Sequence, residues 1–135
     1  MSSAQQEMNE QVFKSLTGDV ALVSALNGSK VFDRVPERVS PPYIVMGQMS
    51  GTDWSTSTEG GEVVTFTLHT WSKTNSREES HNLQSHVRRI LESGAVTLPG
   101  HHLISLRALF SEVRRARISA RLHGVMRFRG VTEPK

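Results

Sequence analysis

The chain has 135 residues, of which 36% are hydrophobic and 21% are charged, and this size and composition predict one domain with a core of its own. It contains no cysteine, which excludes a disulfide framework and thiolate chemistry. No apolar run approaches the roughly 20 residues of a membrane span, and the polar first residues lack the apolar centre of a secretion signal.

The net charge of +3 is unevenly distributed along the chain. Residues 1–62 hold four Lys/Arg and eight Asp/Glu, a balance of −4, whereas residues 63–135 hold twelve and five, a balance of +7. This polarity suits contact with nucleic acid, or contact between the acidic flank of one subunit and the basic flank of the next. Ordinary solubility is a third interpretation.

The N-terminal part predicts two helices. Residues 5–16 have apolar side chains at four-residue spacing, and Phe13 is expected to widen the buried stripe formed by Met8, Val12 and Leu16. Asp19 can cap a short second helix over residues 20–26, because its carboxylate accepts the free amide hydrogens of a first turn. Asn27 and Gly28 tolerate positive φ and are expected to end it.

Two strands are predicted next, after a brief extended piece at Val31–Phe32 and a proline-rich connector over residues 33–42. The apolar residues 43–49 predict the first strand, and residues 62–71 predict the second, with one apolar face formed by Val64, Phe66 and Leu68. Between them, residues 50–61 are small, polar and glycine-rich, which predicts a long loop.

A third helix and a final pair of strands are predicted in the second half. Ser76 and Glu79 have the spacing of a capping box, the buried stripe is expected to be Leu83, Val87, Ile90 and Leu91, and Gly94 is the expected stop. Residues 103–113 and 118–128 predict antiparallel strands joined by the basic residues 114–117, and residues 130–135 predict a loose tail. In residues 118–128 the even positions are apolar and the odd positions are mostly polar or basic, so one face should meet a core and the other water.

This order of elements predicts an α+β fold over residues 1–135. We expect a mostly antiparallel four-stranded sheet, with two N-terminal helices and one crossover helix packed on it.

Two groups of residues are candidates for binding. Arg121, Arg127 and Arg129 should project from the same face of the last strand, where they would be solvated, contact phosphates, or meet carboxylates of another subunit. Asp53 and Trp54 lie in the predicted loop, where the indole would either anchor a partner or cover an edge of the core.

No catalytic residue, metal ligand or cofactor is predicted. His81 and His86 are five residues apart on a helix and therefore diverge, and the other histidines show no spacing typical of a metal site. Neither a nucleophile elbow nor a zinc-protease motif is present in the sequence.

Taken in order, several segments resemble the tail-completion, or tail-terminator, proteins of long-tailed bacteriophages and gene transfer agents. The segments are residues 12–26 with Val31–Phe32, the Pro42-Tyr43-Ile44-Val45 strand, the Asp53-Trp54-Ser55-Thr56 loop, and the closing Met126-Arg127-Phe128-Arg129. The resemblance covers nearly the whole chain, and its specificity lies in the order of the segments.

The resemblance implies a structural protein of the virion and no enzyme. It implies a homo-oligomeric ring, typically of six subunits, at the head-proximal end of the tail, which stops polymerisation of the tail-tube protein and joins the tail to the head connector, with DNA passing through its lumen. Assembly would take place in the bacterial cytoplasm, without a membrane. The alternative that the residues alone leave open is a small basic nucleic-acid-binding module.

Overall fold

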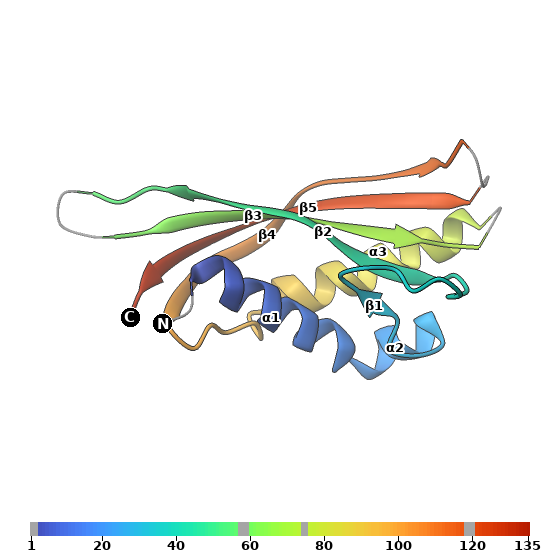
Figure 1. Cartoon of the computed structure of the whole chain (residues 1–135), viewed down its shortest axis with the longest axis horizontal. Coiled ribbons are helices and arrows are strands. Elements are labelled where there is room, and N and C mark those ends of the chain that lie inside the picture. Colours follow the sequence, from blue (N-terminus) through green and yellow to red (C-terminus); the bar gives the residue numbers. More distant parts are fainter. Residues whose placement is uncertain (1–2, 57–59, 74–75, 118–120) are drawn as a thin grey trace.

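The computed structural model describes residues 3–56, 60–73, 76–117 and 121–135, which form three helices and one five-stranded sheet (Figure 1). The helices are α1 (Ala4–Thr17), α2 (Val20–Leu26) and α3 (Arg77–Glu92). The strands are β1 (Val31–Phe32), β2 (Tyr43–Asp53), β3 (Glu62–Trp71), β4 (His101–Arg115) and β5 (Leu122–Pro134). The predicted α+β class is thereby confirmed.

The sheet has the order β1-β2-β3-β5-β4, so β4 and β1 are its edges. All neighbouring strands are antiparallel except β1, which runs parallel to β2 and pairs Val31 with Ile44. The prediction of four strands was therefore incomplete. The strand that the prediction left out is β1, which consists of Val31 and Phe32 alone and is too short to show any periodicity.

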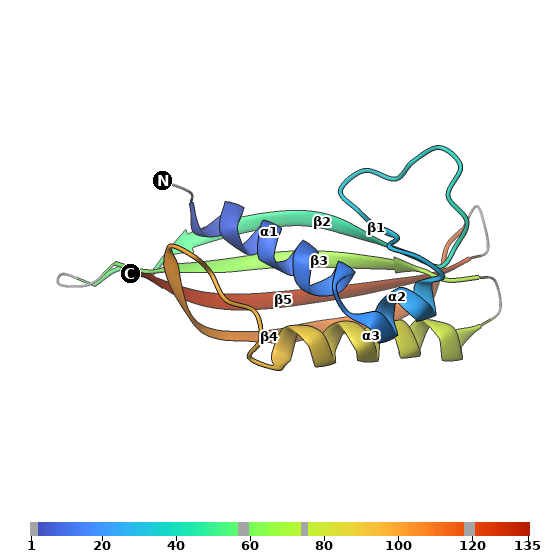
Figure 2. The same ribbon diagram turned by 90° about the horizontal axis from the view of Figure 1, so that it is seen from below.

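All three helices cover the same face of the sheet and leave the other face open (Figures 1 and 2). The core lies between the helices and this covered face. At its centre Phe66 of β3 and Phe128 of β5, which are partners in the strand register, stack with their ring centroids 5.5 Å apart. The predicted alternation of β3 is confirmed, because Val64, Phe66 and Leu68 are each at most 1% exposed.

The two N-terminal helices begin and end where local chemistry requires. The Asp19 carboxylate accepts the amide hydrogen of Leu22 at 2.9 Å, as predicted, and Asn27 ends α2 with φ of 59°. Met8, Val12 and Leu16 are fully buried, but Phe13 is 40% exposed. The expectation that Phe13 widens the buried stripe was wrong, because it lies outside the row that the four-residue spacing turns toward the sheet.

Helix α3 is capped at Ser76, whose hydroxyl accepts the amide hydrogen of Glu79 at 3.1 Å. The predicted buried stripe is confirmed. Near the other end of α3, the Arg89 guanidinium donates to both carboxylate oxygens of Asp19 and, with the amide of Leu22, lowers the pKa of Asp19 to about 2. This ion pair fastens the start of α2 to the last turns of α3.

Two predictions of irregular structure were wrong. Residues 50–53 continue β2 and pair with β3, with Asp53 opposite Glu62, so the predicted loop over residues 50–61 is shorter. The first turn of α1 reaches this part of the sheet through a polar side chain, because Gln5 donates to the Glu62 carboxylate at 3.2 Å. Residues 50–53 are therefore exposed and carry no apolar alternation by which the sequence could indicate a strand. Residues 130–134 likewise belong to β5 rather than to a loose tail, and Thr132 donates its hydroxyl hydrogen to the carbonyl of Glu62 at 2.9 Å.

The final pair of strands was predicted in part. β4 begins at His101 rather than at residue 103, and β5 begins at Leu122, while residues 118–120 of the predicted strand lie outside the described part of the chain. The even positions 122, 124, 126 and 128 are all buried, which confirms the apolar face. Residue Val125, on the other face, is also buried, at 8% exposure.

Candidate interaction surface on the open face of the sheet

The side of the sheet away from the helices, called the open face below, is built by the odd positions of β3 and β5 and by the residues of β4 that pair with them. The register aligns Thr65 with Arg129 and Arg107, and Thr67 with Arg127 and Phe110. These side chains are exposed or half-buried. None of these side chains is therefore part of the buried core.

Three arginines gather at the centre of this face, and together with Phe110 they are called the arginine face. Arg107 of β4 pairs directly with Arg129 of β5, and Arg127 lies two positions further along β5. Within the described residues, none of the three forms an ion pair; the guanidinium carbon of Arg127 instead lies 5.9 Å from the centroid of the Phe110 ring. Like charges directly opposite on a sheet are unfavourable, so an additional anion would stabilise the arginine face. Of its members, Arg107 already helps, against the effect of burial, to lower the pKa of the Glu92 carboxyl through its charge.

The structure brings together two of the three arginines singled out by the sequence. Arg127 and Arg129 project from one face of β5, whereas Arg121 precedes the strand, and its carbonyl accepts the amide hydrogen of Ala116 at 2.7 Å. Sequence reasoning did not single out Arg107 or Phe110 as site residues. Their positions depend on two register shifts in β4, between Leu103 and Ser105 and between Ala108 and Phe110.

The edge strand β4 exposes three large apolar side chains: Ile104, Leu109 and Phe110. Ile104 and Leu109 stand at the two register shifts and are 52% and 51% exposed. A β-bulge bends the strand and re-aims its side chains, which accounts for apolar residues that neither enter the core nor lie flat on the sheet. Apolar groups interspersed with arginines are typical of protein interfaces.

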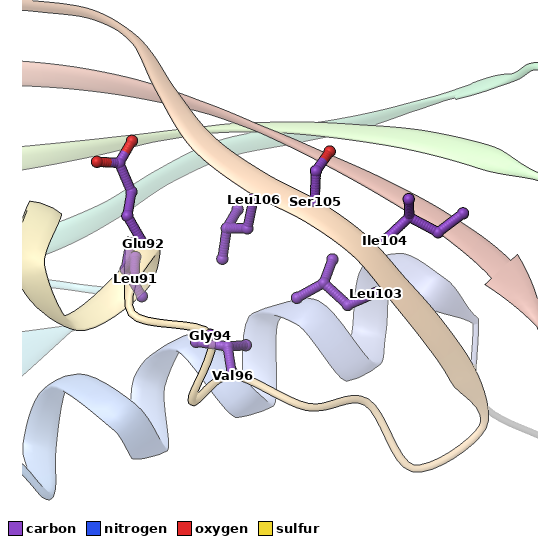
Figure 3. A pocket seen from close by; sticks show the side chains of 8 residues that line it. All are labelled: Leu91, Glu92, Gly94, Val96, Leu103, Ile104, Ser105 and Leu106. Carbon is purple, nitrogen blue, oxygen red and sulfur yellow. The ribbon is translucent and has the colours of Figure 1, made fainter.

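A pocket of about 300 Å³ lies beside Ile104, between the end of α3 and the first half of β4 (Figure 3). In Figure 3, Leu103 and Leu106 turn toward the pocket and Ile104 extends away from it. Glu92 is the charged residue in the lining of the pocket, and its carboxylate already accepts the amide hydrogen of Ala108 at 2.8 Å. The pocket therefore offers no set of convergent polar groups for a small ligand.

Two histidines and a tryptophan form a cluster at one end of the open face. The Nδ1 atom of His69 lies 2.8 Å from Nε2 of His123, and the His123 ring stacks on the indole of Trp71 with 4.1 Å between ring centroids. Burial, and then the neighbouring positive charges, lower the pKa of both histidines, that of His123 to about 4. Both rings are therefore neutral at pH 7, and one donates to the other.

The predicted loop residues Asp53 and Trp54 lie at the other end of the sheet, at the β2–β3 hairpin. The Asp53 carboxylate accepts hydrogen bonds from the amide and hydroxyl of Ser55, which lower its pKa. The Trp54 indole donates its N–H to the carbonyl of Thr132 at 3.1 Å and packs on Gly61, where an added Cβ would lie 2.3 Å from the ring. Trp54 thus folds back onto the hairpin, yet it remains 38% exposed.

Groups suited to metal binding do not occur in the described part of the chain, where no three His, Asp or Glu residues are close enough to hold an ion. Among the same residues, no helix is both long and apolar enough to cross a membrane. An open sheet face, arginines that form no ion pair among the described residues and exposed apolar side chains on an edge strand are features typical of proteins that contact other macromolecules.

Comparison with known protein families shows the family to which this chain belongs. The chain belongs to the family of the tail completion protein gp17, whose model matches residues 10–133. Members of this family are structural components of virion tails and are not enzymes. The resemblance noted in the sequence is thereby confirmed.

Individual relatives agree with this assignment. The tail completion protein gp17 of Bacillus phage SPP1 is 26% identical over 88 residues, a match that covers 65% of this chain and 65% of that protein, just under two thirds of its length. Its solved structure has a TM-score of 0.65 at 21% identity, covering 94% of this chain and 89% of the other. A chain from the virion of a native gene transfer agent particle has a TM-score of 0.86 at 22% identity, covering 98% and 99%.

Proposed function

We propose that this chain forms a ring, of six subunits, at the head-proximal end of a phage-type tail. There it ends polymerisation of the tail-tube protein and offers the surface on which the head connector docks, while DNA passes through its lumen. Membership of the gp17 family supports the place in the tail. Assembly of the virion components would follow in the cytoplasm of the bacterial host.

The observation that carries the ring is the presence of two unlike uncovered surfaces on one chain. The arginines of the arginine face form no ion pair among the described residues, and the β2–β3 hairpin is acidic and bears the exposed Trp54. Unlike surfaces of this kind make head-to-tail contacts, which close into a ring when the rotation between neighbours permits. A chain that associated through a single self-complementary patch would stop at a dimer.

The test is polymerisation of purified tail-tube protein with and without this chain, followed by electron microscopy. We expect the chain to halt growth at one end and to leave a ring visible there, so that tubes become shorter as its concentration rises. Tubes that grow equally long at every concentration, with both ends alike, would contradict the proposal. Adding the chain after growth has ended controls for disassembly, since finished tubes should keep their length.

A nucleic-acid-binding module is the second candidate, and the arginines without ion pairs are the observation that favours it. Phosphate contacts would make duplex DNA binding fall steeply with salt. In a plot of the logarithm of the association constant against the logarithm of the salt concentration, the slope should become more negative by about one for each phosphate neutralised. This candidate needs no oligomer. A chain that stays monomeric and binds duplex DNA tightly at physiological salt would replace the ring by this function.

A further inference from the structure

We propose that the β2–β3 hairpin of one copy docks on the arginine face of the next copy. The docking segment, called the acidic arm, comprises the described residues 50–56 and 60–63, and its receptor is Arg107, Arg127, Arg129 and the neighbouring Phe110. The inference rests on the proposed self-association, and it names the surfaces that would make each contact around a ring.

The first argument is the charge of the arm. Residues 39–72 contain no Lys or Arg, while Asp53 and Glu62 supply two negative charges within the arm. Asp53 is exposed, and the hydrogen bonds from Ser55 hold its carboxylate in the ionised form. The arginine face has the opposite sign, so that each copy of the chain contains both halves of a complementary pair.

The second argument is the exposed edge of the arm. β1 pairs only with Ile44 and Val45, which leaves the outer edge of β2 without a partner from Met46 to Asp53 within the described chain. Apart from Met49, residues 47–56 are all exposed, and none is a lysine or proline. Natural sheets usually protect a long edge with such residues or with bulges. The register shift of β2 lies between Met46 and Met49, so the edge from Ser50 to Asp53 beyond it is available to be covered on assembly.

The third argument is the rigid aromatic side chain at the base of the arm. Trp54 is held by its hydrogen bond to Thr132 and by its packing on Gly61, and part of its ring remains accessible. A side chain that is already fixed loses little conformational entropy on binding, and tryptophan is enriched among the residues that dominate interfaces. The apolar residues Leu109 and Phe110 beside the arginines offer it a matching surface.

The arm cannot satisfy the arginines of its own chain. Asp53 pairs with Glu62, which pairs with Thr132, and Arg127 lies five positions before Thr132 along β5. Five residues of strand span roughly 17 Å, and the arm continues the sheet away from this position (Figure 1). The arm of the same chain therefore does not reach Arg127, and an anion for this arginine would come from outside the chain.

The arm binds the face through side chains rather than as an added strand along the middle of β4. Two backbone groups on that part of β4 are already occupied from α3, because Glu92 accepts from the amide of Ala108 and Gln84 donates to the carbonyl of Glu112 at 2.9 Å.

Exposed aliphatic side chains next to the arginines favour a protein ligand over DNA, because phosphate contacts involve polar groups alone.

Charge reversal tests the contact. Asp53→Lys reverses the sign of the charge at this position of the acidic arm, and Arg127→Glu with Arg129→Glu reverses the sign of the charge on the arginine face. We expect each change to raise the dissociation constant of self-association by about tenfold or more, and the three changes combined in one chain to restore it, since a basic arm then meets an acidic face. Light scattering over a range of concentrations measures the association, and thermal unfolding confirms that every variant is folded.

Matched controls separate this contact from general charge effects. Lys73→Glu with Arg77→Glu changes the net charge by the same amount at exposed positions near the start of α3, and should leave association unchanged. Asp53→Asn retains an oxygen that can accept from Ser55 but removes the charge, and should weaken association less than Asp53→Lys.

Covalent trapping gives a second readout, because the chain contains no cysteine of its own. A mixture of one preparation carrying Asp53→Cys and another carrying Arg127→Cys should form a disulfide-linked dimer under mild oxidation. Within one chain the two positions are too far apart for a disulfide, which requires Cα atoms within about 7 Å. Arg77→Cys in place of Arg127→Cys should give no such dimer.

The outcomes distinguish this inference from the proposed function. If the unmodified chain assembles and the reversed face assembles equally well, the docking inference is overturned while the ring stands. Loss of association in each reversed variant without recovery in the combined variant also overturns it. If the reversed face loses duplex DNA binding but keeps its oligomeric state, the arginines serve nucleic acid instead. A chain that never associates refutes the proposed function itself.

Discussion

The two faces of this sheet carry side chains of the same kinds under opposite constraints. Phe128 on β5 and Phe110 on β4 illustrate the difference, since Phe128 is fully buried against Phe66 beneath the helices and Phe110 is 44% exposed under the Arg127 guanidinium. Burial dictates the covered face, because its side chains must fill space, and the Thr70 hydroxyl is the buried side-chain group there that has no hydrogen-bond partner among the described residues. The open face is free of that requirement, so its arginines and apolar groups point to a role outside folding.

The largest expected effect comes from cutting back the covered face. Phe128→Ala should reduce the free energy of unfolding by about 3–5 kcal/mol, because a cavity is left in a close-packed core. Denaturant unfolding followed by circular dichroism measures the loss.

Phe110→Ala is the matched control on the open face and should cost less than about 1 kcal/mol, as most surface substitutions do. Equal losses in the two variants would mean that both faces are structural, and the distinction between them would fail.

A second test adds volume to the covered face. An added Cβ at Gly124 would lie 2.2 Å from the hydroxyl oxygen of Thr70 and 2.8 Å from the side-chain nitrogen of Gln84, so Gly124→Ala should cost about 1–3 kcal/mol. Thermal unfolding measures it. Gly60→Ala is the control, since its Cβ would have no neighbour nearer than 3.5 Å, and its melting temperature should match that of the unchanged chain.

The histidine cluster on the open face predicts a dependence on pH. The folded-state pKa of His123 is about 4, below the ordinary value of 6.5, so between these values the unfolded chain binds a proton that the folded chain does not. The contribution of His123 to stability is complete above about pH 6.5 and is lost as the pH falls toward 4. His69 shifts in the same direction.

The measurement is the melting temperature of the chain and of His123→Gln between pH 4 and 7. The unchanged chain should lose stability more steeply than the variant as the pH falls through this window. Parallel curves would show that the His123 ring is not held neutral by the fold.

The smallest expected effect has the opposite sign. Arg129→Glu places a carboxylate directly opposite Arg107, and exchanging a like-charge pair for an opposite-charge pair should stabilise the unassembled chain by roughly 0.2–1 kcal/mol. The same change should weaken assembly. A comparison of melting temperatures at low and high salt checks the first claim, because the gain should shrink as salt screens it.

The contrast between buried and exposed parts of the sheet also explains which elements could be predicted from the sequence. The caps at Asp19 and Ser76 and the alternation of β3 were predictable, because local chemistry and burial impose them. The continuation of β2 to Asp53 was not, since residues 50–53 are exposed and neither face of that part of the strand is required to be apolar. A strand held by backbone pairing alone, with both faces exposed, leaves no periodic signal in the sequence.

The candidate surface was predictable to a similar degree. Parity along one strand was enough to place Arg127 and Arg129 on a common face. The position of Arg107 opposite Arg129 depends on the register of β4, which two bulges alter, and bulges of this kind are not readable from residue types. The exposed Phe110 could have been suspected only from the broken alternation of residues 103–113.

The most direct test of the account is the mass of the purified, untagged chain in solution, measured by native mass spectrometry across a range of concentrations. The account predicts one discrete closed assembly, at six times the 15.0 kDa of a single chain, that forms without nucleic acid. A species of 15.0 kDa alone at every concentration, or an open series of masses without a preferred size, would contradict it.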